Sequence, residues 1–282
     1  MNPRKSRPKL SLRPASLINQ VVLLFFGLLA IYPVYYMVVT AFKTRDNWLH
    51  DQFGLPNPFT LQNIADALSK GNIPLWFGNS IIVTVFSLAL STIVSALAAY
   101  ALARFRFPGR ALYFNTMIAL MVIPPAVLIL PLFLLMVAIG LISTLTSVIV
   151  IYSGLLIPFS IYLLVSFFRG LPPELFDAAA IDGCSNLAIF WQITLPLSTP
   201  ALVTLMVVNA LFVWNELLIA LVFLQSEGSK TLMPGLTLFK GHFTVNEPLI
   251  MAGTLLATFP MILLYLFGQR LFVEGLVAGA VK

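Results

Sequence analysis

The sequence predicts an all-α polytopic membrane protein with six transmembrane helices and a cytosolic loop that contains helices of its own. Of the 282 residues, 60% are hydrophobic and 9% are charged, and the mean hydropathy is +0.98. A chain of this composition cannot give a globular domain a polar surface. Its apolar stretches lie within or above the range of about 17–25 residues that a helix needs to cross a bilayer, and polar segments separate them.

The N-terminal segment, residues 1–16, is predicted to be a cytosolic tail because it carries five basic residues and no acidic residue. The apolar run at 17–42 is longer than the ~7–15-residue core of a signal peptide, and no small-residue cleavage site follows it. We therefore expect a first transmembrane helix, which Pro33 is able to kink. With the external loop that follows, this helix makes up the predicted unit 17–78.

The second and third apolar stretches are joined by a tight basic turn. Asn79 is expected to cap a helix at 80–105, whose serines and alanines allow close packing against other helices. Prolines interrupt the third stretch, 111–140, so a kinked or broken helix is expected there. This bend has two interpretations: it lets the helix pack against its neighbours, or it forms the wall of a gate or pathway. The basic residues of the turn are Arg104, Arg106 and Arg110, and the prolines are Pro124, Pro125 and Pro131.

A fourth helix is predicted at 147–168, and a polar segment at 169–200 follows it. This segment is expected to fold as a helix, a turn and a second helix. Pro173 suits the first position of a helix, and Glu174 and Asp177 place negative charge in its first turn. Because the flanking stretches are apolar enough for lipid, this segment is the part of the chain expected to meet a soluble partner.

Particular residues also predict the turn and the second helix of the segment. Gly183 suits the left-handed residue that closes a helix, and Ser185 is expected to cap a second helix that continues to Pro196. The alanines at 178–180 give the first helix a small-residue face that suits docking into a groove of a partner.

Two other interpretations of the segment are an ordinary cytosolic hairpin and a DNA-binding helix-turn-helix. The second fails on charge, since a phosphate-binding surface needs several cations. Arg169 is the only base in the segment, which contains the acids Glu174, Asp177 and Asp182. No nucleic-acid partner is therefore expected.

The fifth apolar helix is predicted at 200–224 and contains the one ionisable residue that lies well inside an apolar span, Glu216. Asn209 lies two turns earlier, so both polar side chains are expected to point the same way. A carboxylate in the membrane costs ~2.5–3.5 kcal/mol on insertion scales, so Glu216 is expected to face protein or water. Two roles are compatible with the sequence: Glu216 is a hydrogen-bond node between helices, or it lines a passage.

The remaining chain is predicted to be an external loop at 225–249, a sixth helix at 251–268 and a cytosolic tail at 269–282. Residues 79–268 thus hold five helices and the loop at 169–200. A nucleotide-binding loop is absent, because the glycines that such a loop needs around Lys230 are replaced by Ser229 and Leu224. His50 and His242 have no second ligand at metal spacing and are expected to be surface residues, and the single cysteine, Cys184, excludes an internal disulfide.

The distribution of bases predicts the orientation. Eleven Lys and Arg residues lie in the two termini, the basic turn and the polar segment, whereas five lie in the other three loops. Since cytosolic loops carry the excess of Lys and Arg, both termini and the polar segment are predicted to be cytosolic.

A spacing in the polar segment resembles a known motif. Asp177-Ala178-Ala179, three residues, Gly183, nine residues and then Ile193-Thr194-Leu195-Pro196 is similar to the EAA loop of the membrane subunits of bacterial ABC importers, with Asp177 where the motif has Glu. The triplet Trp214-Asn215-Glu216 resembles the fifth-helix signature of sugar-importing permeases, and the C-terminal tail resembles that of maltose-type second permease subunits.

The resemblance implies a permease subunit of a binding-protein-dependent carbohydrate importer in the bacterial cytoplasmic membrane. It implies that the polar segment is the coupling helix, docked into an ATPase dimer that binds ATP and Mg²⁺, and it assigns no enzyme activity or cofactor to this chain. A second homologous permease subunit, an external substrate-binding protein and the lipid membrane are the other implied partners. The residues assigned to ATPase coupling are Glu174, Asp177, Ala178, Ala179, Asp182, Gly183, Ile193, Leu195 and Pro196; those assigned to the passage or to helix packing are Asn209, Trp214, Asn215 and Glu216.

Two alternatives belong to other functional classes. A proton-coupled secondary transporter that uses Glu216 leaves the motif in the polar segment unexplained. A membrane enzyme lacks two catalytic groups at a spacing that lets them cooperate. Dependence of uptake on a co-expressed ATPase or on a proton gradient separates the first alternative from the ATP-driven importer.

Overall fold

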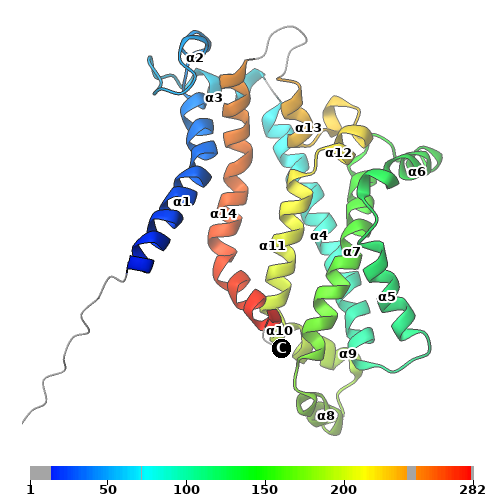
Figure 1. The fold of residues 1–282 in the computed structure, drawn as a ribbon. Helices are drawn as coiled ribbons and strands as arrows, with labels where there is room; N and C mark the ends of the chain where they lie inside the picture. Colours follow the sequence, from blue (N-terminus) through cyan, green and yellow to red (C-terminus); the bar gives the residue numbers. More distant parts are fainter. Residues whose placement is uncertain (1–13, 71, 240–245, 281–282) are drawn as a thin grey trace, which may run out of the picture.

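The computed structural model describes residues 14–70, 72–239 and 246–280, and within them the protein is a bundle of helices without a β-strand (Figure 1). The predicted tail at 1–13 and His242 lie outside the described residues. The first half contains α1 (Pro14–Ala41), α2 (Arg45–His50), α3 (Gln62–Lys70), α4 (Ile73–Arg104), α5 (Arg110–Leu120), α6 (Pro125–Ala138) and α7 (Leu145–Arg169). The second half contains α8 (Pro173–Ile181), α9 (Asn186–Ile189), a π-helical turn (Phe190–Thr194), α10 (Leu195–Leu197), α11 (Thr199–Asn215), α12 (Leu218–Phe223), a 3₁₀ turn (Glu227–Ser229), α13 (Leu232–Thr237) and α14 (Glu247–Ala280).

By length and composition, four of the described helices are able to cross a membrane: α1, α4, α7 and α14. Two bent pairs raise the number to six if each pair is one span. The first pair is α5 with α6, bent by 101°, and the second joins the segment Asn186–Leu197 to α11 with a bend of 75°. The predicted all-α polytopic architecture is confirmed.

The centre of the bundle is the contact between α4 and α7. Serine side chains of α4 are buried there, and Ser87 Oγ donates to the carbonyl of Ile149 at 3.4 Å. Ser153 of α7 donates to the carbonyl of Ser87, also at 3.4 Å. Small residues let the two backbones approach closely, as the composition of this helix predicts.

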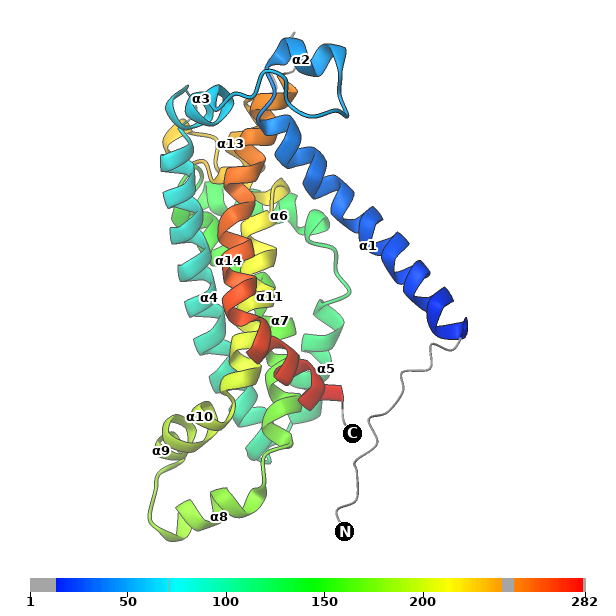
Figure 2. The ribbon, with the colours of Figure 1, turned by 90° about the vertical axis from the view of Figure 1, so that its left-hand side faces the viewer.

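The first helix, α1, lies apart from this centre. Figure 2 shows α1 leaning away from the other helices toward its N-terminal end, and none of its candidate spanning window is buried. Large apolar side chains such as Leu23 and Leu29 are 71% and 60% exposed. A helix that is apolar all round and open on its sides is suited to lipid or to an apolar partner.

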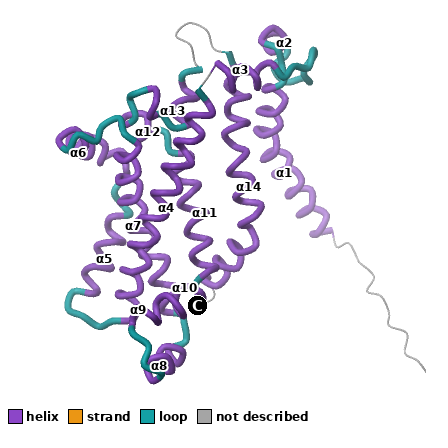
Figure 3. The backbone as a smooth tube through the Cα atoms, turned by 180° about the vertical axis from the view of Figure 1, so that it is seen from behind, coloured by secondary structure: helices purple, strands orange, loops and turns teal. Residues whose placement is uncertain are grey.

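The third apolar stretch is broken rather than kinked. Residues 121–124 separate α5 from α6, and Pro124 has an extended backbone with φ −62° and ψ 132°. The following Pro125 occupies the first position of α6. Consecutive prolines disfavour helical geometry at the preceding residue and remove backbone donors, which explains why the stretch breaks at this point. Figure 3 shows the loop between α5 and α6.

Three predicted helix ends are wrong. The second helix begins at Ile73 instead of Ser80, so Asn79 is an interior residue and not a cap. The fifth helix ends at Asn215 instead of continuing to Leu224, and the chain re-forms a helix at Leu218. At Asn79 and Glu216 the polar side chain is used in a tertiary contact, which a local pattern does not reveal. The sixth helix continues as α14 to Ala280 instead of ending at Gly268, so residues 269–280 of the predicted tail are helical.

Candidate coupling hairpin and polar contacts of the bundle

The segment at 169–200 projects beyond the bundle at the end where α4 finishes (Figures 1 and 2). Pro172 has φ −56° and ψ 125°, so the chain leaves α7 in an extended conformation. Pro173 is the first residue of α8, and Glu174 lies in its first turn. The start of this helix is therefore where its proline and acidic residue predict.

Gly183 closes α8 in a left-handed conformation with φ +80°. The amide of Gly183 donates to the carbonyl of Ala180 at 3.1 Å, and the amide of Cys184 donates to the carbonyl of Ala179 at 3.0 Å. This pair of bonds is a Schellman motif, which satisfies carbonyls at the end of the helix. No atom lies within 4 Å of a Cβ added at Gly183, so the backbone angle alone favours glycine here.

The helix α8 has an inward and an outward face. Phe176 and Ala179 are 6% and 7% exposed and pack into the core formed by the ends of α4, α7 and α11 next to the hairpin. Ala178 is exposed, and Ile181 is 87% exposed. The prediction that Ala179 belongs to an outward docking face is therefore wrong, because this alanine packs against its own chain.

The outward face also carries the acidic side chains of Glu174, Asp177 and Asp182, all exposed. Together with Ala178 and Ile181 they form a surface that is acidic at its edges and apolar at its centre. We refer to these five residues as the outer face of α8.

The second helix of the hairpin starts at the predicted residue and then changes from α-helical to π-helical geometry. Ser185 Oγ accepts the amide of Ala188 at 3.2 Å, which makes Ser185 the cap of α9. From Phe190 to Thr194 the turn is π-helical, and the amide of Leu195 donates to the carbonyl of Phe190. Pro196 follows directly, and because it has no N–H it cannot continue the regular ladder.

The motif residues at the end of the hairpin differ in exposure. Ile193 and Leu195 are partly buried and pack against the same core as Phe176, whereas Pro196 is exposed. The structure thus brings Ile193, Leu195 and Ala179 together as the support of the hairpin, and leaves Pro196 at its surface.

Arg104, at the last position of α4, contacts α8 directly. Its guanidinium carbon lies 3.2 Å from the centroid of the Phe176 ring, and the Asp177 carboxylate attracts the same cation. From the sequence, Arg104 is predicted only as a charge of the basic turn. Its position at a helix end does not indicate a contact with a residue 72 positions further along the chain.

Two polar contacts join α11 to α7. Asn209, 1% exposed, donates from Nδ2 to Ser160 Oγ at 3.1 Å. The hydroxyl of Tyr152 donates to Glu216 Oε2 at 2.6 Å. The prediction that Asn209 and Glu216 point the same way is therefore confirmed, and both point at α7.

Glu216 is not inside a continuous helix. It lies in the break between α11 and α12 with φ −71° and ψ 123°, and its carboxylate accepts the amide of Ile219 at 2.9 Å and that of Ala220 at 3.1 Å. These are the contacts of a side chain that caps the start of a helix. The carboxylate joins α12 to α7 through Tyr152.

The two residues that precede Glu216 in the sequence do not bond to α7. Trp214, 4% exposed, donates from its indole to the carbonyl of Ala257 in α14 at 3.0 Å, and it meets the ring of Phe77 edge-on. Asn215 is exposed and donates to the carbonyl of Leu211 in its own helix. Of the predicted triplet, only Trp214 and Glu216 make contacts with other helices.

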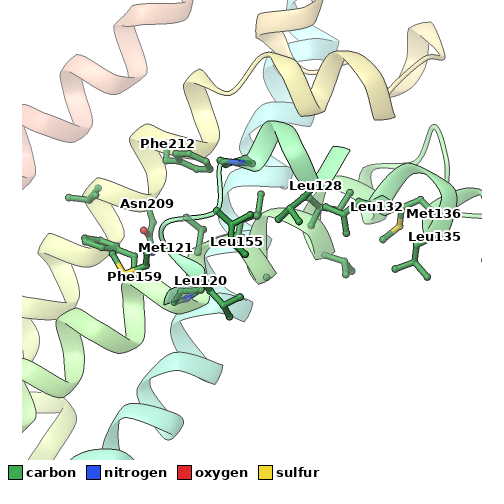
Figure 4. A pocket seen from close by; sticks show the side chains of 18 residues that line it. Leu120, Met121, Leu128, Leu132, Leu135, Met136, Leu155, Phe159, Asn209 and Phe212 are labelled. Carbon is green, nitrogen blue, oxygen red and sulfur yellow. The ribbon is translucent and has the colours of Figure 1, made fainter. Parts of the chain in front are cut away.

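A pocket of about 640 Å³ lies at the elbow between α5 and α6, with α7 and α11 forming its other walls (Figure 4). Leu120 and Met121 come from the end of α5, Leu128 and Leu132 from α6. Asn209 is the only lining residue with a polar side chain, and its amide is bonded to Ser160. A pocket with so few hydrogen-bonding groups does not recognise a polyhydroxylated solute by itself.

The architecture defines the class of protein. Long apolar helices, two broken spans and a polar hairpin outside the bundle are features of an integral membrane transport component. Among the described residues, no group of three His, Cys, Asp or Glu side chains is placed to hold a metal ion.

Comparison with known proteins gives the family. Residues 91–273 match the model of the binding-protein-dependent transport system inner membrane component, and this match covers more than half of the chain. The chain therefore belongs to this family of ABC importer permeases, and it is a transport component, not an enzyme.

Relatives resemble the chain over nearly its whole length. It is 33% identical over 262 residues to the arabinooligosaccharides transport system permease protein AraQ of Halalkalibacterium halodurans, covering 92% of this chain and 93% of the relative. It is also 33% identical to the melibiose/raffinose/stachyose import permease protein MelC of Bacillus subtilis, covering 89% and 91%. A solved bacterial ABC transporter involved in the import of alginate matches with a TM-score of 0.82, 25% identity, and coverage of 94% and 99%.

Proposed function

We propose that this chain is the permease subunit of an ATP-driven ABC importer for a sugar or related polyol. It moves the solute inward by alternating access, and a separate ATPase supplies the energy. The observation that carries this proposal is the hairpin α8–α10, which projects from an apolar bundle and presents an exposed outer face. Relatives with carbohydrate transport names support the solute class.

The proposal assigns two roles within the hairpin. The outer face of α8, with Glu174, Asp177, Ala178, Ile181 and Asp182, enters a cleft on the ATPase. The remaining motif residues set the shape and hold the hairpin on the bundle: Gly183 makes the turn, Ala179, Ile193 and Leu195 pack inward, and Pro196 accompanies the π-helical turn. ATP and Mg²⁺ are bound by the ATPase and not by this chain.

The other partners follow from the same proposal. A second homologous permease subunit completes the passage, an ATPase dimer docks on the cytosolic side, and an external substrate-binding protein delivers the solute. A solved alginate transporter in complex with a periplasmic protein carrying an alginate pentasaccharide has the same fold, with a TM-score of 0.67 and 15% identity. In this arrangement the chain lies in the bacterial cytoplasmic membrane with both termini in the cytosol.

Asn209, Trp214 and Glu216 act in the proposal as nodes that hold α11 and α12 against α7 and α14, whereas Asn215 is exposed and bonds to a carbonyl of its own helix. Alternating access then changes the relative positions of helices that these bonds join. A proton-coupled transporter remains the second candidate because of Glu216. Its carboxylate has the contacts of a structural cap, which favours the node over a proton carrier.

Capture of the ATPase tests the proposal. The chain is co-expressed with its partner permease and ATPase, and a tag on this chain is used for purification in mild detergent. Wild type is expected to retain the ATPase, and Ile181→Asp, which places a charge at the centre of the outer face, is expected to lose most of it. Thr199→Ala, at an exposed position next to the hairpin, serves as the matched control. Equal retention by Ile181→Asp would contradict the docking role of α8.

A further inference from the structure

The helix α4 is a long, unbroken helix that connects the two sides of the molecule. Its 32 residues correspond to about 48 Å at 1.5 Å per residue, whereas the hydrocarbon core of a bilayer is about 30 Å thick. Both ends of α4 therefore extend past the apolar core. Among the four long helices that the structure describes, α4 alone has no proline beyond its first turn; the others contain Pro33, Pro158 and Pro260.

The inner end of α4 is fixed to the hairpin. Arg104 lies over the ring of Phe176, on the inward side of α8, at 3.2 Å, and the Asp177 carboxylate on the outward side attracts the same cation. Phe176 is 6% exposed, which limits the number of positions that the ring can adopt. A cation over an aromatic ring contributes more as the pair is desolvated.

The outer end of α4 is fixed to the segment between α12 and α14. Asn79 Nδ2 donates to the carbonyls of Gly228 and Lys230, both at 2.9 Å. Ser80 Oγ accepts the amide of Leu232 at 2.8 Å, at the start of α13. Asn79 and Ser80 are 6% and 4% exposed, so these bonds are formed inside the protein. Figure 2 shows α4 running from this outer region to the region of α9 and α10.

We propose that α4 links the coupling hairpin to the external segment 227–232, with Arg104 and Asn79 as the positioning residues at its two ends. This inference rests on the proposed function and deepens it. A displacement of α8 by the ATPase is carried through Arg104 to α4, and Asn79 carries the same displacement to the external segment. A contact of the binding protein on the external side acts in the opposite direction, because coupling between two sites is reciprocal.

The alternative connections contain breaks. The pair α5 and α6 is bent by 101°, and α11 ends at Asn215 before α12 begins. Helix α7 contains Pro158 near its middle, although it packs closely along α4. A helix without an interior proline or break transmits a displacement with less loss, so α4 is the stiff element of the bundle.

A double-mutant cycle tests the link, because position between two sites is not by itself proof of coupling. The complete complex of this chain, its partner permease and its ATPase is reconstituted in vesicles. The readout is the ratio of ATP hydrolysis with and without the binding protein, loaded with the solute that co-purifies with it. The variants are Arg104→Gln, Asn79→Ala and the double variant. Arg104→Lys keeps the cation, and Arg106→Gln and Asn57→Ala are controls at exposed positions of the same residue types.

Each single variant is expected to lower the stimulation at least about 3-fold while it retains the ATPase during purification, and Arg104→Lys is expected to recover part of the loss. The stimulation measured for the double variant is expected to be no lower than that of the single variant with the lower stimulation. Residues 25 positions apart on a helix are separated by about 37 Å, and independent sites at such distances add within ~0.3–0.5 kcal/mol, or about 2-fold. Additive losses would overturn the link, as would normal stimulation in Arg104→Gln. Loss of the ATPase from the wild-type complex would instead overturn the proposed function.

Discussion

The prediction that follows most directly from the hairpin geometry concerns Gly183. Its φ of +80° costs a residue with a Cβ about 1–2 kcal/mol, and a β-branched residue more. Since no neighbour lies within 4 Å of the added Cβ, the substitution creates no clash and the whole cost is in the backbone. At 1.4 kcal/mol for each tenfold change, alanine shifts the turn toward other geometries by roughly 5- to 30-fold, and valine by more.

The shift is expected to appear as weaker ATPase binding, because only the native turn presents the outer face of α8 correctly. Gly183→Val therefore lowers the affinity for the ATPase by at least about 10-fold, and Gly183→Ala has a smaller effect. Gly183→Asn is the matched control, since asparagine adopts the left-handed conformation more readily than other residues. The loop lies outside the apolar bundle, so all three variants are expected at normal abundance in the membrane.

The assay is binding of the purified permease complex in nanodiscs to immobilised ATPase, with membrane abundance measured on the same cells. The expected order of affinity is wild type, asparagine, alanine and valine. An unchanged affinity in Gly183→Val would refute the reasoning, because it would show that the turn does not set the docking geometry. A parallel loss of abundance in all three variants would also refute it, because it would show a folding defect.

Three further predictions test other parts of the structure. Ala179→Asp buries a charge without a partner and is expected to destabilise the subunit by at least about 2 kcal/mol, seen as a lower melting temperature in detergent, whereas Ile181→Asp leaves the melting temperature unchanged. Glu216→Gln keeps an oxygen for the amides of α12 and is expected to preserve assembly and uptake; a well-assembled complex without uptake would show that the carboxylate has a direct role in transport. In a chain whose native cysteine is replaced by serine, a cysteine at Ser226 is expected to react with a membrane-impermeant reagent from outside and one at Ser185 is not; external labelling at Ser185 would reverse the orientation.

The sequence predicted the elements whose signals are local. Pro173 marks the start of α8, Gly183 marks its end, and Pro124 with Pro125 marks the break in the third span. In each case a single residue type restricts the backbone strongly, through a fixed φ, a missing N–H or a permitted left-handed angle. Such restrictions act without help from the rest of the chain.

The features that the sequence did not reveal depend on tertiary contacts. Asn79 looks like a helix cap, yet its side-chain amide donates to the carbonyls of Gly228 and Lys230, and the helix begins about two turns earlier. The apolar pattern continues through Glu216 without a proline or glycine, although the carboxylate caps α12 and ends the fifth helix there. Ala179 faces inward because α8 packs on the bundle, which the composition of the helix alone does not state.

The central claim, that an ATPase acting through α8 drives uptake, is tested most directly by the energy source. Right-side-out vesicles that enclose ATP are prepared with this chain and its partner permease, with the binding protein outside, and with or without the ATPase. Radiolabelled arabino-oligosaccharides and melibiose, the solutes in the names of relatives, are the probes. Uptake is predicted to require the ATPase and internal ATP and to continue when a protonophore removes the proton gradient. Uptake that persists without the ATPase and stops with the protonophore would contradict the account and assign Glu216 to proton coupling.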